Sequence, residues 1–147
     1  MSEWKKIESQ KDIDELLDFY GGFHDSCLVS AVFHSGAYVT DGLSMGFGAA
    51  EEYTLTTTFQ RQWRPKTLEM RFVGLRRFHL TGAENNYIPL LLDAFITFHE
   101  NLLPGEPKRV IVWSEYEFNA AEIDNSLTEP GESYIVANRL EWRIIDD

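Results

Sequence analysis

The sequence lacks the features of a secreted, membrane-bound or disulfide-stabilised protein. It contains one cysteine, Cys27, so no internal disulfide can form, which fits a reducing compartment. Its longest apolar runs are about six residues, too short to span a bilayer. The opening residues, MSEWKKIESQ, hold no apolar signal core. We therefore expect a cytoplasmic location and no membrane interaction.

Basic residues are scarce, and the chain is strongly acidic. The formal net charge is −11 over 147 residues, while 44% of the residues are hydrophobic, enough to build one folded core. Residues 60–80 are the exception, with six Lys or Arg against Glu69 alone. An acidic surface repels nucleic acid and attracts basic partners, although acidity also serves solubility alone. We expect one domain, 1–147, that binds no nucleic acid.

One helix is indicated near the N-terminus, and strands follow it. Residues 9–20, SQKDIDELLDFY, place apolar side chains at helical spacing, with Asp12 as the expected N-cap and Gly21-Gly22 as the stop. From Ser26 onward the apolar period changes to two, which is typical of strands. The expected strands span 26–34, 38–40, 43–47, 53–60, 67–73, 75–80, 110–118 and 133–145.

The apolar pattern also predicts which strand residues are buried. Strand 26–34 is apolar on both faces, as in a central strand, which would bury Cys27 in one row with Val29, Ala31 and Phe33. Gly74 is expected to form a bulge or bend. The inward residues predicted for three other strands are Tyr53, Leu55, Thr57 and Phe59; Leu68, Met70 and Phe72; and Tyr134, Val136, Leu140, Trp142 and Ile144.

Residues 86–103 fit either a helix or a strand. We favour a strand over 94–98, because the strand after it needs an antiparallel neighbour, and a helix over 87–100 stays open. The predicted fold class is α+β, mainly β. It consists of an N-terminal helix followed by a curled antiparallel meander of about eight strands.

Catalytic and metal-binding motifs are missing from the sequence. It has no P-loop, no nucleophile elbow and no dinucleotide fingerprint, and its four histidines form no i, i+4 pair. We therefore predict no enzymatic activity, no metal and no cofactor. The alternative is a small hydrolase or carbohydrate-active protein that uses Glu115 or Glu117 beside Trp113.

Binding to another protein is better supported than catalysis. Trp63 lies between Arg61 and Arg64 in a turn, and these residue types are enriched at interface hot spots. A purely structural role, in which Trp63 folds back over the sheet edge, stays open. The predicted partner contacts are Trp63, Trp113, Glu115, Tyr116 and Glu117, together with the acidic loop 122–132.

His24 and Asp25 lie between the helix and the first long strand. Backbone N–H groups need acceptors there, and Asp25 can supply one in an Asx-type turn. His24 can bond to a carbonyl oxygen or to a neighbouring acid. We favour a structural elbow over a reactive pair.

Four segments occur in an informative order along the chain. They are FHDSCLVSAVF, TLEMRFVGLRRFHL, VIVWSEYEF and YIVANRLEWRII. Together they resemble small bacterial proteins of the immunity protein 50 family, and the resemblance extends from residue 23 to residue 145. It implies a non-catalytic protein that binds and blocks a cognate toxin, and many such toxins are basic nucleases. His24 and Asp25 carry over as a structural signature only, and homo-oligomerisation is left open.

Overall fold

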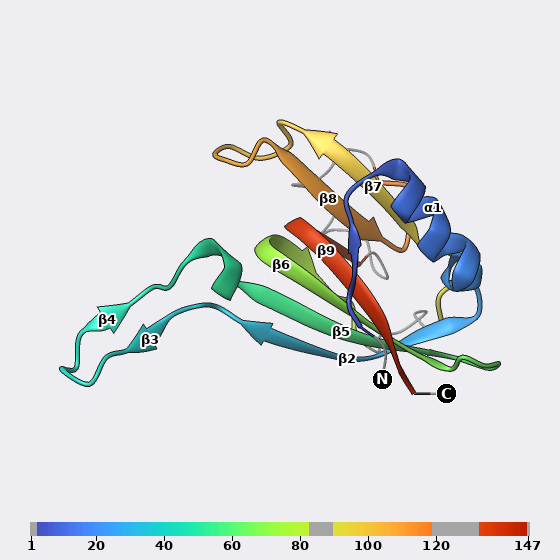
Figure 1. Cartoon of the computed structure of the whole chain (residues 1–147), viewed down its shortest axis with the longest axis horizontal. Coiled ribbons are helices and arrows are strands. Elements are labelled where there is room, and N and C mark those ends of the chain that lie inside the picture. Colours follow the sequence, from blue (N-terminus) through green and yellow to red (C-terminus); the bar gives the residue numbers. More distant parts are fainter. Residues whose placement is uncertain (1–2, 83–89, 119–132, 147) are drawn as a thin grey trace.

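The computed structural model describes residues 3–82, 90–118 and 133–146 and is mainly β, as predicted. All its strand pairs are antiparallel (Figure 1). Within the described residues, no helix is both long and apolar enough to cross a membrane. In chain order the elements are β1 (Lys5–Ile7), α1 (Gln10–Phe19), η1 (Gly21–Phe23), β2 (Ser26–His34), β3 (Tyr38–Val39), β4 (Met45–Gly46), η2 (Ala50–Glu52), β5 (Thr54–Arg61), β6 (Thr67–His79), β7 (Phe95–Glu100), β8 (Arg109–Ser114) and β9 (Tyr134–Asp146).

The main sheet consists of two antiparallel meanders that meet along its two longest strands. The strand order is β2-β5-β6-β9-β8-β7, and β1 also pairs with β9. One side of β9 pairs with β6 along most of its length. Its other side pairs with β8 through residues 134–137 and with β1 through residues 140–142. The last strand therefore lies in the middle of the sheet rather than at the end of one continuous meander.

Helix α1 is confirmed, but its cap differs from the prediction. Ser9 is the N-cap, and Asp12 closes a capping box by accepting hydrogen bonds from the backbone N–H groups of Glu8 (2.8 Å) and Ser9 (3.1 Å). The side chains of Ile13 and Leu16 are buried and attach the helix to the core. The helix contacts both β1 and β7 (Figure 1).

The predicted inward rows of β5 and β6 are confirmed except at Tyr53, which precedes β5 and is half-buried. In β5, Leu55, Thr57 and Phe59 are buried while the threonines between them are half-buried. In β6, every second residue from Leu68 to Phe72 is fully buried. Alternation of this kind follows from the two-residue period of a strand whose one face covers the core.

Strand β2 is an edge strand, so the prediction of a central strand was wrong. It pairs with β5 along one side, and its other side carries only the bridge from Ser26 to Leu91 among the described residues. Cys27 is half-buried, and every residue from Val29 to His34 is exposed. Apolar residues on both faces of this strand reflect an uncovered surface rather than burial on both sides.

Gly74 has the backbone distortion that the sequence indicated. Its φ is +68°, and an added Cβ would clash with the side chain of Asn138 on β9. The chain bends without ending the strand, so β6 is one strand rather than two.

Near this point the alternation of β9 also shifts: Ile135 and Leu140 both belong to the main core. Tyr134 and Val136 therefore form a second cluster with Val110 and Val112, which corrects the single predicted face.

Residues 95–100 form a strand, which confirms the favoured interpretation and excludes a helix there. This strand helps to bury an aromatic cluster in the main core. The ring of Phe23 lies 5.0 Å from that of Phe59 and 6.2 Å from that of Trp113, with near-perpendicular planes in both pairs. Edge-to-face contacts of this kind stabilise beyond the area that they bury.

Arg61 is a buried cation at the end of the inward row of β5. Its guanidinium lies 4.5 Å from the ring centroid of Tyr20 and 4.8 Å from that of Trp63. Its Nη1 donates to the carbonyl of Phe19 (3.2 Å), and its Nε donates to the carbonyl of Pro65 (2.8 Å). The side chain thus ties the end of α1 to the turn between β5 and β6, with its charge held by two rings and two carbonyl oxygens.

We expect Arg61→Leu to lower the free energy of unfolding by about 2 kcal/mol, because it removes two charge-assisted hydrogen bonds and two cation–π contacts. Arg64→Leu is the matched control, since Arg64 is exposed in the same turn, and its effect should stay within about 0.5 kcal/mol. Urea unfolding followed by circular dichroism measures both. Equal losses in the two variants would contradict the assigned role of Arg61.

Candidate functional site

The chain between α1 and β2 forms a tight elbow. Gly21, Gly22, Phe23 and Asp25 all have φ between +58° and +65°. Three backbone hydrogen bonds tie the elbow to residues 91–94: Asp25 N–H to the Leu91 carbonyl (2.9 Å), Leu91 N–H to the Ser26 carbonyl (2.8 Å) and Ala94 N–H to the Gly22 carbonyl (2.9 Å). The elbow therefore fixes where α1 ends relative to the start of β2.

His24 makes both kinds of contact that its position predicted. Its Nδ1 lies 2.5 Å from the carbonyl oxygen of Leu92, and its Nε2 lies 3.4 Å from a carboxylate oxygen of Asp25. The hydrogen bond to Leu92 raises the pKa of His24, and the negative charge of Asp25 raises it further. Asp25 contacts this ring in place of the expected Asx-type turn.

Trp63 lies beside this elbow and is 46% exposed. A Cβ at Gly21 would lie 3.4 Å from the Trp63 ring, so the indole packs directly against the end of α1. The inner side of the ring stacks on Arg61. Trp63 therefore covers a buried charge, and part of its indole stays exposed to solvent.

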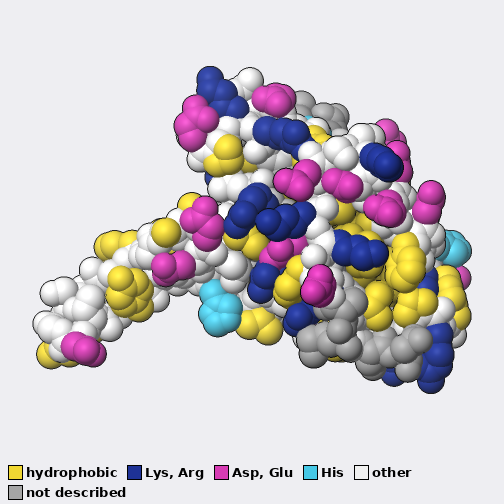
Figure 2. All heavy atoms as spheres, viewed as in Figure 1, with side chains coloured by type: hydrophobic (Ala, Val, Ile, Leu, Met, Phe, Trp, Pro, Cys, Tyr) yellow, Lys and Arg dark blue, Asp and Glu magenta, His cyan; other side chains and the backbone are white. Residues whose placement is uncertain are grey.

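Exposed carboxylates lie on α1, which ends at this elbow. Asp14 and Asp18 are four residues apart, so they share one exposed face of the helix. Asp25 is near the same turn, because Ser26 pairs with Arg61 at that end of the sheet. We call Asp14, Asp18, His24, Asp25 and Trp63 the helix-end surface. Figure 2 shows several Asp and Glu side chains over the α1 side of the body.

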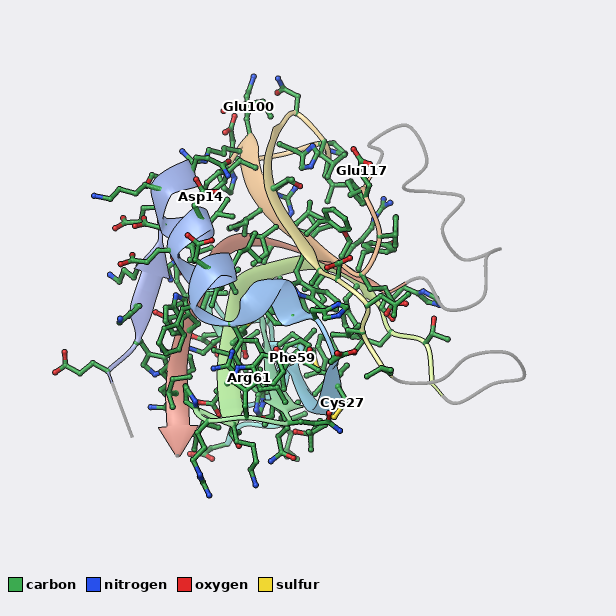
Figure 3. The ribbon with its side chains drawn as sticks, turned by 90° about the vertical axis from the view of Figure 1, so that its right-hand side faces the viewer. Asp14, Cys27, Phe59, Arg61, Glu100 and Glu117 are labelled. Carbon is green, nitrogen blue, oxygen red and sulfur yellow. The ribbon has the colours of Figure 1, made fainter. Side chains whose placement is uncertain are left out.

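The other predicted contacts lie elsewhere. Trp113 is 1% exposed in the aromatic core, so its side chain is not accessible to a partner, and its indole N–H has no acceptor among the described residues. Strand β8 ends at Ser114, and Tyr116 is half-buried against the second core cluster. Glu115 is half-buried, whereas Glu117 is exposed, and it lies away from Asp14 in Figure 3. Loop 122–132 lies outside the described residues.

A long arm is the feature that the sequence analysis missed. It consists of residues 29–49: the outer part of β2, which pairs with β5, leads into the β3–β4 hairpin, and this hairpin projects from the body (Figure 1). It carries one carboxylate, Asp41, and no Lys or Arg. Its exposed large apolar residues are Val29, Val32, Phe33, Tyr38, Val39, Leu43, Met45 and Phe47. Apolar residues on both faces of 26–34 were the available indication.

A pocket of about 540 Å³ lies against β1, β6 and β9. Its floor includes Val73, Gly74 and Leu140, and its rim carries charges of both signs. Arg109 on this rim is already engaged, because its guanidinium lies 3.6 Å from the ring centroid of Phe98 and donates to the Glu8 carbonyl (2.7 Å). None of the predicted site residues lines this pocket.

No protein-family model, curated protein or solved structure matches this chain. Across residues 3–82, 90–118 and 133–146, no group of three His, Cys, Asp or Glu side chains is arranged to hold a metal ion. Over the same residues, the helix-end surface and the arm are exposed features with distinct chemistries.

We expect the NMR titration midpoint of His24 to lie above 6.5 and that of His99 to lie below it. The hydrogen bond to Leu92 and the charge of Asp25 favour protonated His24, whereas burial disfavours protonated His99. His24 therefore stabilises the fold below pH 6.5, and this contribution disappears as the pH rises through its raised pKa.

Asp25→Asn is the matched variant for this titration, because asparagine tolerates the positive φ of this position. It should lower the His24 midpoint only part of the way to 6.5, since the larger contribution comes from Leu92. A wild-type midpoint at or below 6.5 would show that the bond to Leu92 does not form in solution.

Proposed function

We propose that this chain is a non-catalytic immunity-type protein that binds a basic toxin domain through its helix-end surface and blocks it. The observation that carries the proposal is a half-exposed Trp63 held between Arg61 and Gly21 at the end of α1, a helix with Asp14 and Asp18 exposed and with Asp25 in the elbow that follows it. The resemblance of four segments to the immunity protein 50 family gives the class of partner. Such a protein would act in the cytoplasm.

Trp63 has the properties of a binding anchor. Interface hot spots are enriched in Trp, Tyr and Arg, and they bind best when the side chain is already ordered in the free protein. The stack on Arg61 and the contact with Gly21 restrict the indole, while almost half of the side chain stays in water. A partner that covers Trp63 would bury apolar area with little loss of conformational freedom.

The net charge of the chain favours a basic partner. The whole chain carries a net charge of −11, and Asp14 and Asp18 add negative charge on α1, whereas the turn that holds Trp63 carries Arg64 and Lys66. Long-range attraction of this kind accelerates association and is screened by salt. A toxin with a basic nucleic-acid groove would be attracted to this side of the molecule and would lose access to its substrate once bound.

The hydrolase alternative gains no support from the geometry. It needs a carboxylate pair beside an accessible aromatic wall, but Trp113 is buried and Glu117 is exposed beyond the end of β8. The pocket near Gly74 is lined by neither residue. A binding role uses the exposed aromatic and acidic groups that the structure brings together.

We expect affinity capture from a lysate of the native organism to recover one stoichiometric basic protein that is lost progressively as the salt concentration of the wash rises. Screening of the acidic surface is the physical reason. Mass spectrometry identifies the captured protein. Recovery of no stoichiometric partner, or of one whose binding does not respond to salt, would contradict the proposal.

Two double variants with the same charge change locate the contact. Asp14→Asn with Asp18→Asn should slow association with the captured protein about tenfold, whereas Glu51→Gln with Glu117→Gln should change it less than about twofold. All four residues are exposed; Glu51 lies on η2, far from α1 in Figure 1, and Figure 3 shows Glu117 away from Asp14. Slower association only in the second variant would move the contact away from α1 and overturn the assignment to the helix end.

A further inference from the structure

The arm presents an apolar surface that the proposed function does not use. Eight large apolar side chains between Val29 and Phe47 are exposed, including Leu43 at 85%. In Figure 2 the arm is mostly uncharged, with charged side chains concentrated on the body. Exposed apolar side chains that gather on one segment of a folded protein mark contact surfaces.

The outer part of β2 also has an open backbone edge. Beyond the bridge at Ser26, no described strand pairs with this side of β2, and the irregular pairing near Leu28 leaves Ser30–His34 regular. Edge strands are usually protected by Lys, Pro or inward charges. The stretch 27–34, CLVSAVFH, contains no Lys, Arg, Asp, Glu or Pro. This edge is open to pairing with another strand.

The arm is an ordered element rather than a loose loop. Tyr38 packs its ring against Gly46 across the β3–β4 pair, and a Cβ at Gly46 would clash with that ring. Tyr53 covers Gly36 in the same way, and its hydroxyl donates to the carbonyl of Phe47 (2.5 Å). Binding through an ordered arm loses little conformational entropy.

Charge favours a second copy as the occupant. Two chains of net charge −11 repel each other, so a contact between copies is most favourable where charge is lowest. The arm satisfies this condition, because Asp41 is its only carboxylate and it carries no Lys or Arg. An arm without Lys or Arg offers no counter-charge to an acidic partner and only one carboxylate to a basic one.

We propose that two copies associate through their arms, with the Ser30–His34 segments of β2 paired antiparallel about a two-fold axis. This arrangement continues the sheet across the interface and places apolar side chains of one copy against those of the other. Half-exposed Phe33, Tyr38 and Phe47 would bury roughly 300 Å² per copy. The five exposed aliphatic side chains of the arm add a similar area. The two areas together approach the buried area of a stable interface, which is about 800 Å² per partner.

Sedimentation equilibrium of the full chain tests this proposal without any partner. The expected species has twice the 17.0 kDa mass of the chain, and its dissociation constant should fall as salt rises, because salt screens repulsion between the bodies. Val32→Glu and Leu43→Glu should each raise the dissociation constant at least about tenfold, because each places a charge in an apolar contact. Gln10→Glu adds the same charge at an exposed position on α1 and should leave the dimer intact.

Circular dichroism should show the same fold for all three variants, since each substituted side chain is exposed. A chain that stays monomeric at high salt overturns the proposal, and so does a dimer that persists in both arm variants. A monomer whose arm variants lose a captured protein would assign the arm to that protein instead. Failure of toxin binding alone leaves this result unaffected, because the dimer is measured on the isolated chain.

Discussion

The structure depends on a buried arginine that joins the helix to the sheet. Arg61 ends the inward row of β5, where its guanidinium stacks between Tyr20 and Trp63 and donates to carbonyls at the end of α1 and in the following turn. A cation at a helix C-terminus also interacts favourably with the helix dipole. One side chain therefore fixes the end of α1, the β5–β6 turn and the orientation of Trp63.

Two exposed surfaces with opposite chemistry follow from this framework. The helix-end surface combines an ordered indole with carboxylates, so its association with a basic protein is driven partly by charge. The arm combines an open strand edge with uncharged apolar side chains, so contact there is driven by burial of apolar area. Salt weakens the first kind of contact and strengthens the second, which separates the two surfaces experimentally.

The sequence predicted local structure well and strand neighbours poorly. The alternation in β5 and β6 placed Phe59 and Met70 correctly, because a two-residue period depends only on the local backbone. Apolar residues on both faces of β2 predicted a buried central strand, but an exposed edge strand can have the same pattern. The positions of Trp113 and Trp63 depend on which segments pack together over long sequence distances, and a single periodic pattern does not contain that information.

Hydrogen exchange of the chain with and without the captured partner tests the central claim most directly. The account predicts slower exchange at the end of α1, in the elbow at residues 21–25 and in the turn at residues 61–66, with exchange in the arm at residues 29–49 unchanged by the partner. Slower exchange confined to the arm, to the residues around Gly74 or to the end of β8, with none at the helix end, would contradict it.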